Sequence, residues 1–194
     1  YEKKPRQSGT TRVLDHSILR YGAHGQAIRR VHEILAINSR EAAEEFGELG
    51  LPPDAQPVLI YTRKKDGRRR YADWSTEKNS VSMPGLVSGD YVVAIYVQPA
   101  ANNSLIPSRF LSERAYFRDV GRDIFVSRFD VIYPSGSRPT VERLHYAPLP
   151  TWSTSRVGDV ATFIRKNAER AVAEPRAPAF ERFLPSMRIG QGVD

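Results

Sequence analysis

The stretch that decides the fold is VLDHSILRYGAHGQAIRRVHEILAI, residues 13–37. Two segments rich in apolar and β-branched residues flank the glycine-rich turn GAHG, which is typical of two antiparallel strands joined by a short loop. We therefore expect a β-hairpin. If its turn closes symmetrically, Asp15 lies directly across from His32 and Arg30 lies across from Ser17.

The next segments predict one helix and a second hairpin. NSREAAEEFGEL (residues 38–49) offers Asn38 or Ser39 as an N-cap and Glu41 in the first turn, and Gly50 and two prolines follow it. VLIYTRKKDGRRRYADW (residues 58–74) predicts a hairpin, because Asp-Gly suits the two positive-φ positions of a type I′ turn.

Three later segments also read as strands. The nearly continuous apolar run of residues 91–97 predicts a strand buried on both faces. DIFVSRFDVIYPSGSRPTVERLHYA (residues 123–147) alternates and then breaks at Pro-Ser-Gly, which predicts a third hairpin. GDVATFIRKNAERA (residues 158–171) fits a strand or a short helix, and its β-branched content favours the strand.

These elements predict a mostly β fold, an antiparallel β-sandwich with one short helix. We assign residues 1–172 to this sandwich domain. The segment AEPRAPAFERFLPSM contains Pro175, Pro178 and Pro185, so residues 173–194 are expected to form an extended, proline-containing linker over the surface.

Composition narrows the function classes. The 194 residues are 40% hydrophobic and 26% charged, with no apolar run near the roughly 18 residues of a membrane span, which argues against a disordered or membrane-spanning chain. The absence of cysteine excludes disulfides, thiolate metal sites and a Cys nucleophile, and it fits both a reducing cytosol and a cysteine-poor envelope protein. The chain starts at Tyr1 without an initiator Met, so we expect a piece of a longer polypeptide.

A basic run at residues 63–70, RKKDGRRR, is the candidate binding site. The net charge of +7 permits an anionic partner such as an anionic polymer or an acidic protein surface. Nucleic acid is disfavoured, because no aromatic residues are interleaved with the cations. The alternative is a solvated, screened hairpin tip. The candidate anion-binding residues are Arg63, Lys64, Lys65, Arg68, Arg69 and Arg70.

A two-residue loop would place these cations opposite one another in three like-charged pairs. The pairs are Lys65 with Arg68, Lys64 with Arg69, and Arg63 with Arg70. Opposed like charges destabilise a strand pair by some tenths of a kcal/mol each. Neutralising Arg63, Lys64, Arg69 and Arg70 together is therefore expected to raise stability slightly.

No catalytic residue, metal site or cofactor is predicted. Asp15, Ser17 and His32 would share one strand face, as in a hydrolase triad, but Arg30 rather than His32 lies opposite Ser17, so an exposed polar ladder is the preferred interpretation. The other histidines, at positions 16, 24 and 145, have no HExxH or carboxylate spacing.

Five segments in order carry a family resemblance: VLDHSILRYGAHGQAIRRVHEILAINS, TRKKDGRRR, SVSMPGLVSGDYVVAIYV, DVIYPSG and AEPRAPAFERFLPSMRIG. They resemble an uncharacterised β-rich domain N-terminal to transglutaminase-like domains in bacterial cell-envelope proteins. The resemblance implies a non-catalytic accessory or scaffolding domain, a transglutaminase-like domain C-terminal to it in the same parent chain, and a periplasmic or envelope location. A free-standing anion-binding module acting through the basic hairpin is the alternative.

Overall fold

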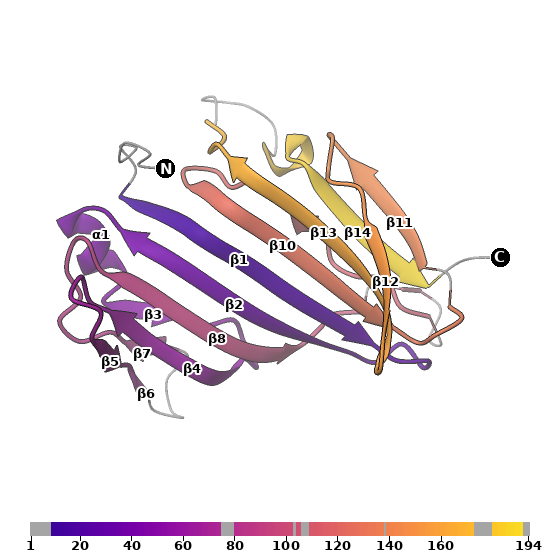
Figure 1. The fold of residues 1–194 in the computed structure, drawn as a ribbon, viewed down its shortest axis with the longest axis horizontal. Helices are drawn as coiled ribbons and strands as arrows, with labels where there is room; N and C mark the ends of the chain where they lie inside the picture. The colour runs from indigo at the N-terminus through magenta and orange to yellow at the C-terminus, as the bar shows by residue number, and fades with distance from the viewer. Residues whose placement is uncertain are drawn as a thin grey trace.

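The computed structural model describes residues 9–74, 80–102, 104–105, 109–137, 139–172 and 180–191 (Figure 1). Strands make up 58% of the structure, and the expected class, mostly β with one short helix, is confirmed. Among these residues no helix has the length and hydrophobicity needed to cross a bilayer.

One sheet of eight strands forms the body of the molecule. Its strands β1 and β10 run parallel, whereas every other neighbouring pair is antiparallel, so the sheet is mixed. In spatial order the strands are β12 (Thr151–Ser155), β13 (Gly158–Ala168), β10 (Asp123–Tyr133), β1 (Thr10–Tyr21), β2 (Ala27–Ile37), β8 (Tyr91–Pro99), β4 (Gln56–Arg63) and β5 (Arg69–Tyr71).

Two three-stranded sheets lie at opposite ends of this large sheet, as Figure 1 shows. One consists of β11 (Pro139–Leu144), β14 (Ser186–Gln191) and β9 (Ala115–Tyr116). The other consists of β3 (Glu48–Gly50), β7 (Ser80–Ser82) and β6 (Asp73–Trp74). The helices are α1 (Arg40–Glu45) and a 3-10 turn, η1 (Phe180–Phe183). Ser39 caps α1 by accepting a hydrogen bond from the Ala42 amide at 3.1 Å, which confirms the predicted helix start.

Each small sheet covers its own hydrophobic core on the same face of the large sheet. Side chains alternate along a strand, so Asp15, Ser17 and Leu19 of β1 share this face, which we call the inner face. The first core joins Leu19, Phe129 and Phe163 to Met187 and Ile189 of β14. The second joins Leu35, Ile60 and Val92 to Leu49 and Val81. The opposite side of the large sheet is the outer face.

Several strand predictions are confirmed. Residues 91–97 lie in β8, where Val92, Val93 and Ala94 are buried in succession, so both faces are covered there. Residues 158–168 form the strand β13 rather than a helix. The first two of the three predicted hairpins, β1–β2 and β4–β5, are present.

The predicted third hairpin is wrong. Strand β10 lies between β1 and β13, and β11 pairs with β14 in a separate sheet. The two strands differ in burial: β10 is buried along most of its length, whereas β11 is largely exposed. A strand that is buried on both faces fits the middle of the large sheet, whereas an exposed strand fits the edge of a small sheet.

The C-terminal segment was expected to run over the surface as a linker, and this is wrong for residues 186–191. They form β14, the central strand of its sheet, with Met187 and Ile189 fully buried. The Pro185 carbonyl accepts a hydrogen bond from the Phe117 amide at 2.9 Å, so the chain is already docked there. Residues 173–179 and 192–194 lie outside the described residues.

Both hairpin loops contain three residues rather than two. The Gly22 amide donates to the Gln26 carbonyl at 2.9 Å, and the Lys64 amide donates to the Arg68 carbonyl at 2.9 Å. In each loop the third residue is a glycine with positive φ, 78° at Gly25 and 84° at Gly67. This is the common three-residue hairpin loop, in which only the third residue adopts the left-handed conformation.

The longer loops shift both predicted registers by one residue. In the first hairpin, His16 rather than Asp15 lies opposite His32, and Val31 rather than Arg30 lies opposite Ser17. In the second hairpin, Arg63 pairs with Arg69, Thr62 with Arg70, and Tyr61 with Tyr71. One like-charged pair therefore remains in the β4–β5 ladder, where the sequence predicted three cation pairs around the turn.

Candidate functional site

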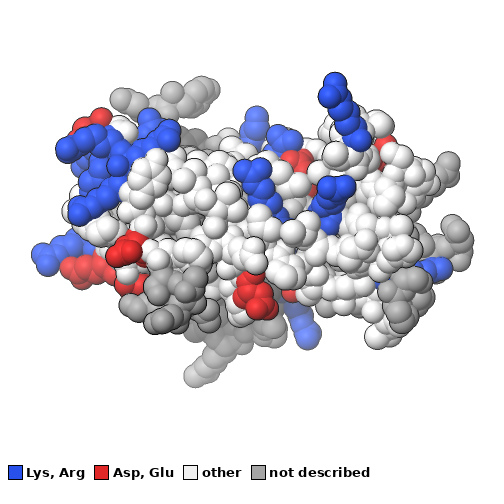
Figure 2. All heavy atoms as spheres, turned by 90° about the horizontal axis from the view of Figure 1, so that it is seen from below, with Lys and Arg blue, Asp and Glu red and all other residues white. Residues whose placement is uncertain are grey.

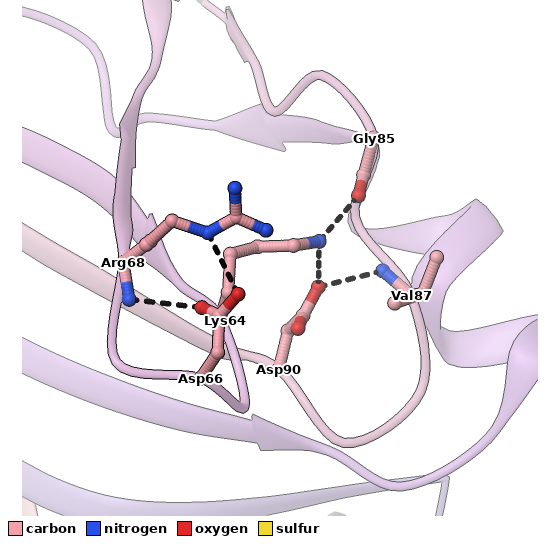
Figure 3. Close-up of polar contacts among 6 residues, drawn as sticks. All are labelled: Lys64, Asp66, Arg68, Gly85, Val87 and Asp90. Carbon is pink, nitrogen blue, oxygen red and sulfur yellow. Dashed lines mark hydrogen bonds and ion pairs between the residues drawn. The ribbon is translucent and has the colours of Figure 1, made fainter.

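The basic tip of the β4–β5 hairpin is the site predicted from the sequence. Figure 2 shows Lys and Arg side chains gathered at the end of the molecule where Figure 1 places β4 and β5. Lys64, however, points inward. Its Nζ donates to the Gly85 carbonyl at 2.7 Å and lies 2.5 Å from Asp90 Oδ2 (Figure 3). The Asp90 side chain is only 2% exposed, so this is a buried ion pair.

Asp90 also accepts a hydrogen bond from the Val87 amide at 3.0 Å, which fixes the loop before β8. Two other cations of the tip have partners as well. Arg68 pairs with Asp66 at 2.7 Å within the turn (Figure 3). The Arg69 guanidinium carbon lies 5.1 Å from the centre of the Tyr61 ring, a cation–π distance.

Arg63, Lys65 and Arg70 form no ion pair with a described carboxylate. Two of them nevertheless pack on the 85–90 loop. A Cβ added to Gly89 would collide with Lys65 Cε, and one added to Gly85 would lie 2.6 Å from an Arg70 nitrogen. The hairpin tip is thus docked on that loop. Anion binding stays a prediction, carried by three cations instead of six.

The residues weighed as a hydrolase triad are not brought together. Asp15 and Ser17 lie on the inner face, whereas His32, opposite His16, lies on the outer face. His32 and Glu33 begin the sequence HEILA, which lacks the second histidine of a zinc-binding HExxH helix and lies in a strand. No group of three His, Cys, Asp or Glu that could hold a metal occurs among the described residues.

The structure shows a charged cleft on the inner face, between the two cores, that the sequence did not indicate. The cleft encloses about 300 Å³. A bulge in β1 between Arg12 and Leu14 places Arg12 on the same face as Asp15, which regular alternation would forbid. Arg12 Nε lies 2.8 Å from Glu33 Oε1, and Arg12 Nη1 lies 3.6 Å from Asp15 and 3.5 Å from Asp119.

The Arg12 guanidinium therefore lies within ion-pair distance of three carboxylates, in a site that is partly shielded from water. Burial raises the pKa of both Asp15 and Glu33 above the ordinary range, and the nearby Arg12 only partly offsets this. The cleft therefore disfavours the charged form of these two carboxyl groups more than water does.

The outer face carries a second polar network, centred on Asp130. Its Oδ2 lies 2.8 Å from His16 Nε2 and accepts a 2.8 Å hydrogen bond from Arg128 Nε, and its Oδ1 accepts one from Thr162 at 2.6 Å. Although burial acts in the other direction, these hydrogen bonds lower the pKa of Asp130. The two faces thus hold carboxylates in opposite electrostatic conditions.

Comparison with family models and with curated proteins found no match. Comparison with solved structures did. The fold is similar to a presumed protease from Parabacteroides distasonis, with a TM-score of 0.74 and 12% identity over 95% of this chain and 40% of that one. It is also similar to an M1 zinc metallopeptidase from Deinococcus radiodurans, with a TM-score of 0.51 and 14% identity over 94% of this chain and 42% of that one.

The expected relationship to the transglutaminase-associated domain is therefore wrong, because the structural likeness is to peptidases. At these identities the likeness concerns the fold. The chain spans about two fifths of the length of the structures that it matches. What the chain resembles is a β-rich portion of these structures.

Proposed function

We propose that this chain is a non-catalytic accessory domain of a longer, peptidase-like polypeptide. The observation that carries the proposal is the likeness to the Parabacteroides distasonis protein, which extends over 95% of this chain but only 40% of that one. The likeness thus involves nearly every element described here and leaves the larger part of the other protein unmatched. The partner we propose is a catalytic domain in the same polypeptide.

The chemistry of the chain supports an accessory role. A zinc peptidase needs three protein ligands around the metal and a group that activates water. No such ligand set occurs in the described part of this chain. A cysteine peptidase needs a thiolate, and the sequence has no cysteine. Asp15 and Ser17 are separated from His32 by the thickness of the sheet, so serine hydrolase chemistry has no support either.

The experiment compares residues 1–194 with the complete product of the encoding gene. Peptide hydrolysis is measured with added zinc and with a chelator. We expect chelator-sensitive hydrolysis by the complete product and none by residues 1–194. Hydrolysis by residues 1–194 alone would contradict the accessory role, and a complete product without peptidase activity would contradict the peptidase-like parent.

A periplasmic or envelope location stays a prediction. Fractionation of cells that express the complete product tests it separately.

A further inference from the structure

Arg29 lies in the inner-face cleft, where its charge acts on Asp15 only from beyond ion-pair distance. It is half-buried on β2, and both its Nε, at 3.2 Å, and its Nη2, at 2.9 Å, donate to the Ser17 hydroxyl. Its guanidinium carbon is 6.0 Å from the centre of the Phe129 ring. Within the described ranges of the chain, no carboxylate comes within ion-pair distance of Arg29.

This arrangement leaves several N–H donors of Arg29 without an acceptor among the described residues. A guanidinium presents five N–H donors in a planar fork that matches the two oxygens of a carboxylate. Here two donors converge on one neutral hydroxyl, and three remain. A cation that is partly removed from water without an opposite charge is costly. The fork is therefore prepared for an anionic acceptor that the described part of the fold does not supply.

Beside Arg29, the Gln98 side chain has a hydrogen-bond acceptor that lacks a donor among the described residues. Gln98 lies directly across from Arg29 in the β2–β8 pair. Its Oε1 is buried and accepts no hydrogen bond from any described residue. Leaving such an oxygen unpaired is unfavourable, because it has lost its hydrogen bonds to water. Arg29 and Gln98 also line the same small pocket, next to Phe110 and Ala100.

The space around these two residues is divided between the pocket at Gln98, of about 20 Å³, and the larger cleft, of about 300 Å³. The pocket that contains Gln98 and the larger cleft share Arg29, Arg114 and Phe129 in their walls. Arg114 is already paired with Glu142 at 3.1 Å, so Arg29 is the cation that remains for a ligand. Asp15 and Glu33 also line the larger cleft and would repel a ligand that carries more than one negative charge.

We propose that this cleft binds the C-terminal residue of a peptide. The terminal carboxylate pairs with the free donors of Arg29, and the backbone N–H of the same residue donates to Gln98 Oε1. A peptide end offers these two groups on one residue, and its single negative charge suits a cleft that already contains carboxylates. The proposal rests on this chain's own residues and is independent of the proposed accessory role.

The experiment titrates residues 1–194 with N-acetyl-alanyl-alanine and, in parallel, with its C-terminal amide, by calorimetry or NMR. We expect saturable binding of the acid and binding weaker by roughly tenfold or more for the amide. Arg29→Gln should weaken binding of the acid to a similar degree. Gln98→Leu should weaken it several-fold, because Leu accepts no hydrogen bond.

Arg30→Gln is the matched control. Arg30 is adjacent in the sequence, but its side chain lies on the outer face with Ile18 and His32, so binding should not change. Arg29→Lys keeps the charge without the fork and should bind the acid more weakly than the parent protein. This variant also provides the test if Arg29→Gln does not fold. No saturable binding, equal binding of acid and amide, or equal losses at Arg29 and Arg30 would overturn the proposal.

Discussion

Arg29 lies on strand β2 and Lys64 directly follows strand β4, but the surroundings of these two cations are opposite. Lys64 belongs to the most basic run of the sequence, and its ammonium is paired with the buried Asp90. Arg29 belongs to no such run, and in the part of the chain that the structure describes its side chain donates hydrogen bonds only to the Ser17 hydroxyl. A run of charge along the sequence therefore does not identify the cation that is available to a ligand. The long-range partner decides this.

The largest expected effect is at Lys64. Lys64→Met would leave the Asp90 carboxylate buried, with the Val87 amide as its remaining hydrogen-bond donor among the described residues. Removing one member of a buried ion pair costs about 3 kcal/mol or more, and the 23% exposure of the Lys64 side chain places this case near the lower end. We expect a lower free energy of unfolding in urea and a melting midpoint reduced by several degrees.

Lys65→Met is the matched control, because Lys65 is exposed and forms no ion pair with a described carboxylate; its effect should stay within about 0.5 kcal/mol. Adding Asp90→Asn to Lys64→Met should recover part of the loss, since the unpaired charge is then removed. Equal effects at Lys64 and Lys65 would contradict the buried pair. The sequence predicted that neutralising Arg63, Lys64, Arg69 and Arg70 together raises stability slightly. For Lys64 we now expect the opposite, because it pairs with Asp90, 26 residues further along the chain.

A smaller effect should distinguish the carboxylates of the two faces by pH. The raised pKa of Asp15 means that the folded state keeps this proton to higher pH than the unfolded chain does. The free energy of unfolding therefore falls as pH rises from the ordinary Asp value through the folded pKa. Asp15→Asn removes this fall, so the variant should gain stability relative to the parent protein as pH rises across that window.

Asp130 should behave in the opposite way. Its pKa is lowered, so its contribution to stability is present above the ordinary Asp value and is lost as pH falls through the folded pKa. Asp130→Asn should therefore lose stability relative to the parent protein as pH rises. Urea unfolding between about pH 3 and pH 7 at constant ionic strength measures both variants. The same sign for both would show that the two faces do not differ as described.

Local signals in the sequence predicted much of the fold. Glycine-rich turns indicated both hairpins, Ser39 indicated the start of α1, and the apolar run of residues 91–97 indicated the buried strand β8. Each of these depends on neighbouring residues only. The pairings that failed involve distant segments: β10 beside β1 in parallel, and β11 beside β14. No local pattern specifies which of several strands fills the middle of a sheet.

The registers failed for a more specific reason. Gly25 and Gly67 were taken as parts of symmetric two-residue turns, but each is the third residue of a three-residue loop. A glycine fits both a two-residue and a three-residue loop. A type I′ turn would also require a positive φ at Asp66, and Asp66 does not have one. One extra loop residue changes every cross-strand partner in the hairpin.

The candidate site was harder to predict than the fold. The basic tip was visible because its charges are consecutive. Arg29 and Arg30 look alike in the sequence, yet one lines the cleft and the other lies on the outer face. Arg12 reaches the cleft through a bulge, and Gln98 comes from a strand about 70 residues after Arg29 in the chain. These placements depend on register and long-range pairing.

The smallest effect should come from the like-charged pair left in the β4–β5 ladder, Arg63 opposite Arg69. Arg63→Thr removes this repulsion and introduces a β-branched residue, so the free energy of unfolding should rise by a few tenths of a kcal/mol. Arg70→Thr is the control, because Arg70 faces the uncharged Thr62. The difference between the two variants should shrink at about 1 M salt, where the Debye length is only about 3 Å. A lower melting midpoint for Arg63→Thr at low salt would mean that Arg63 has a stabilising partner, and it would then resemble Lys64 rather than the exposed cations of the tip.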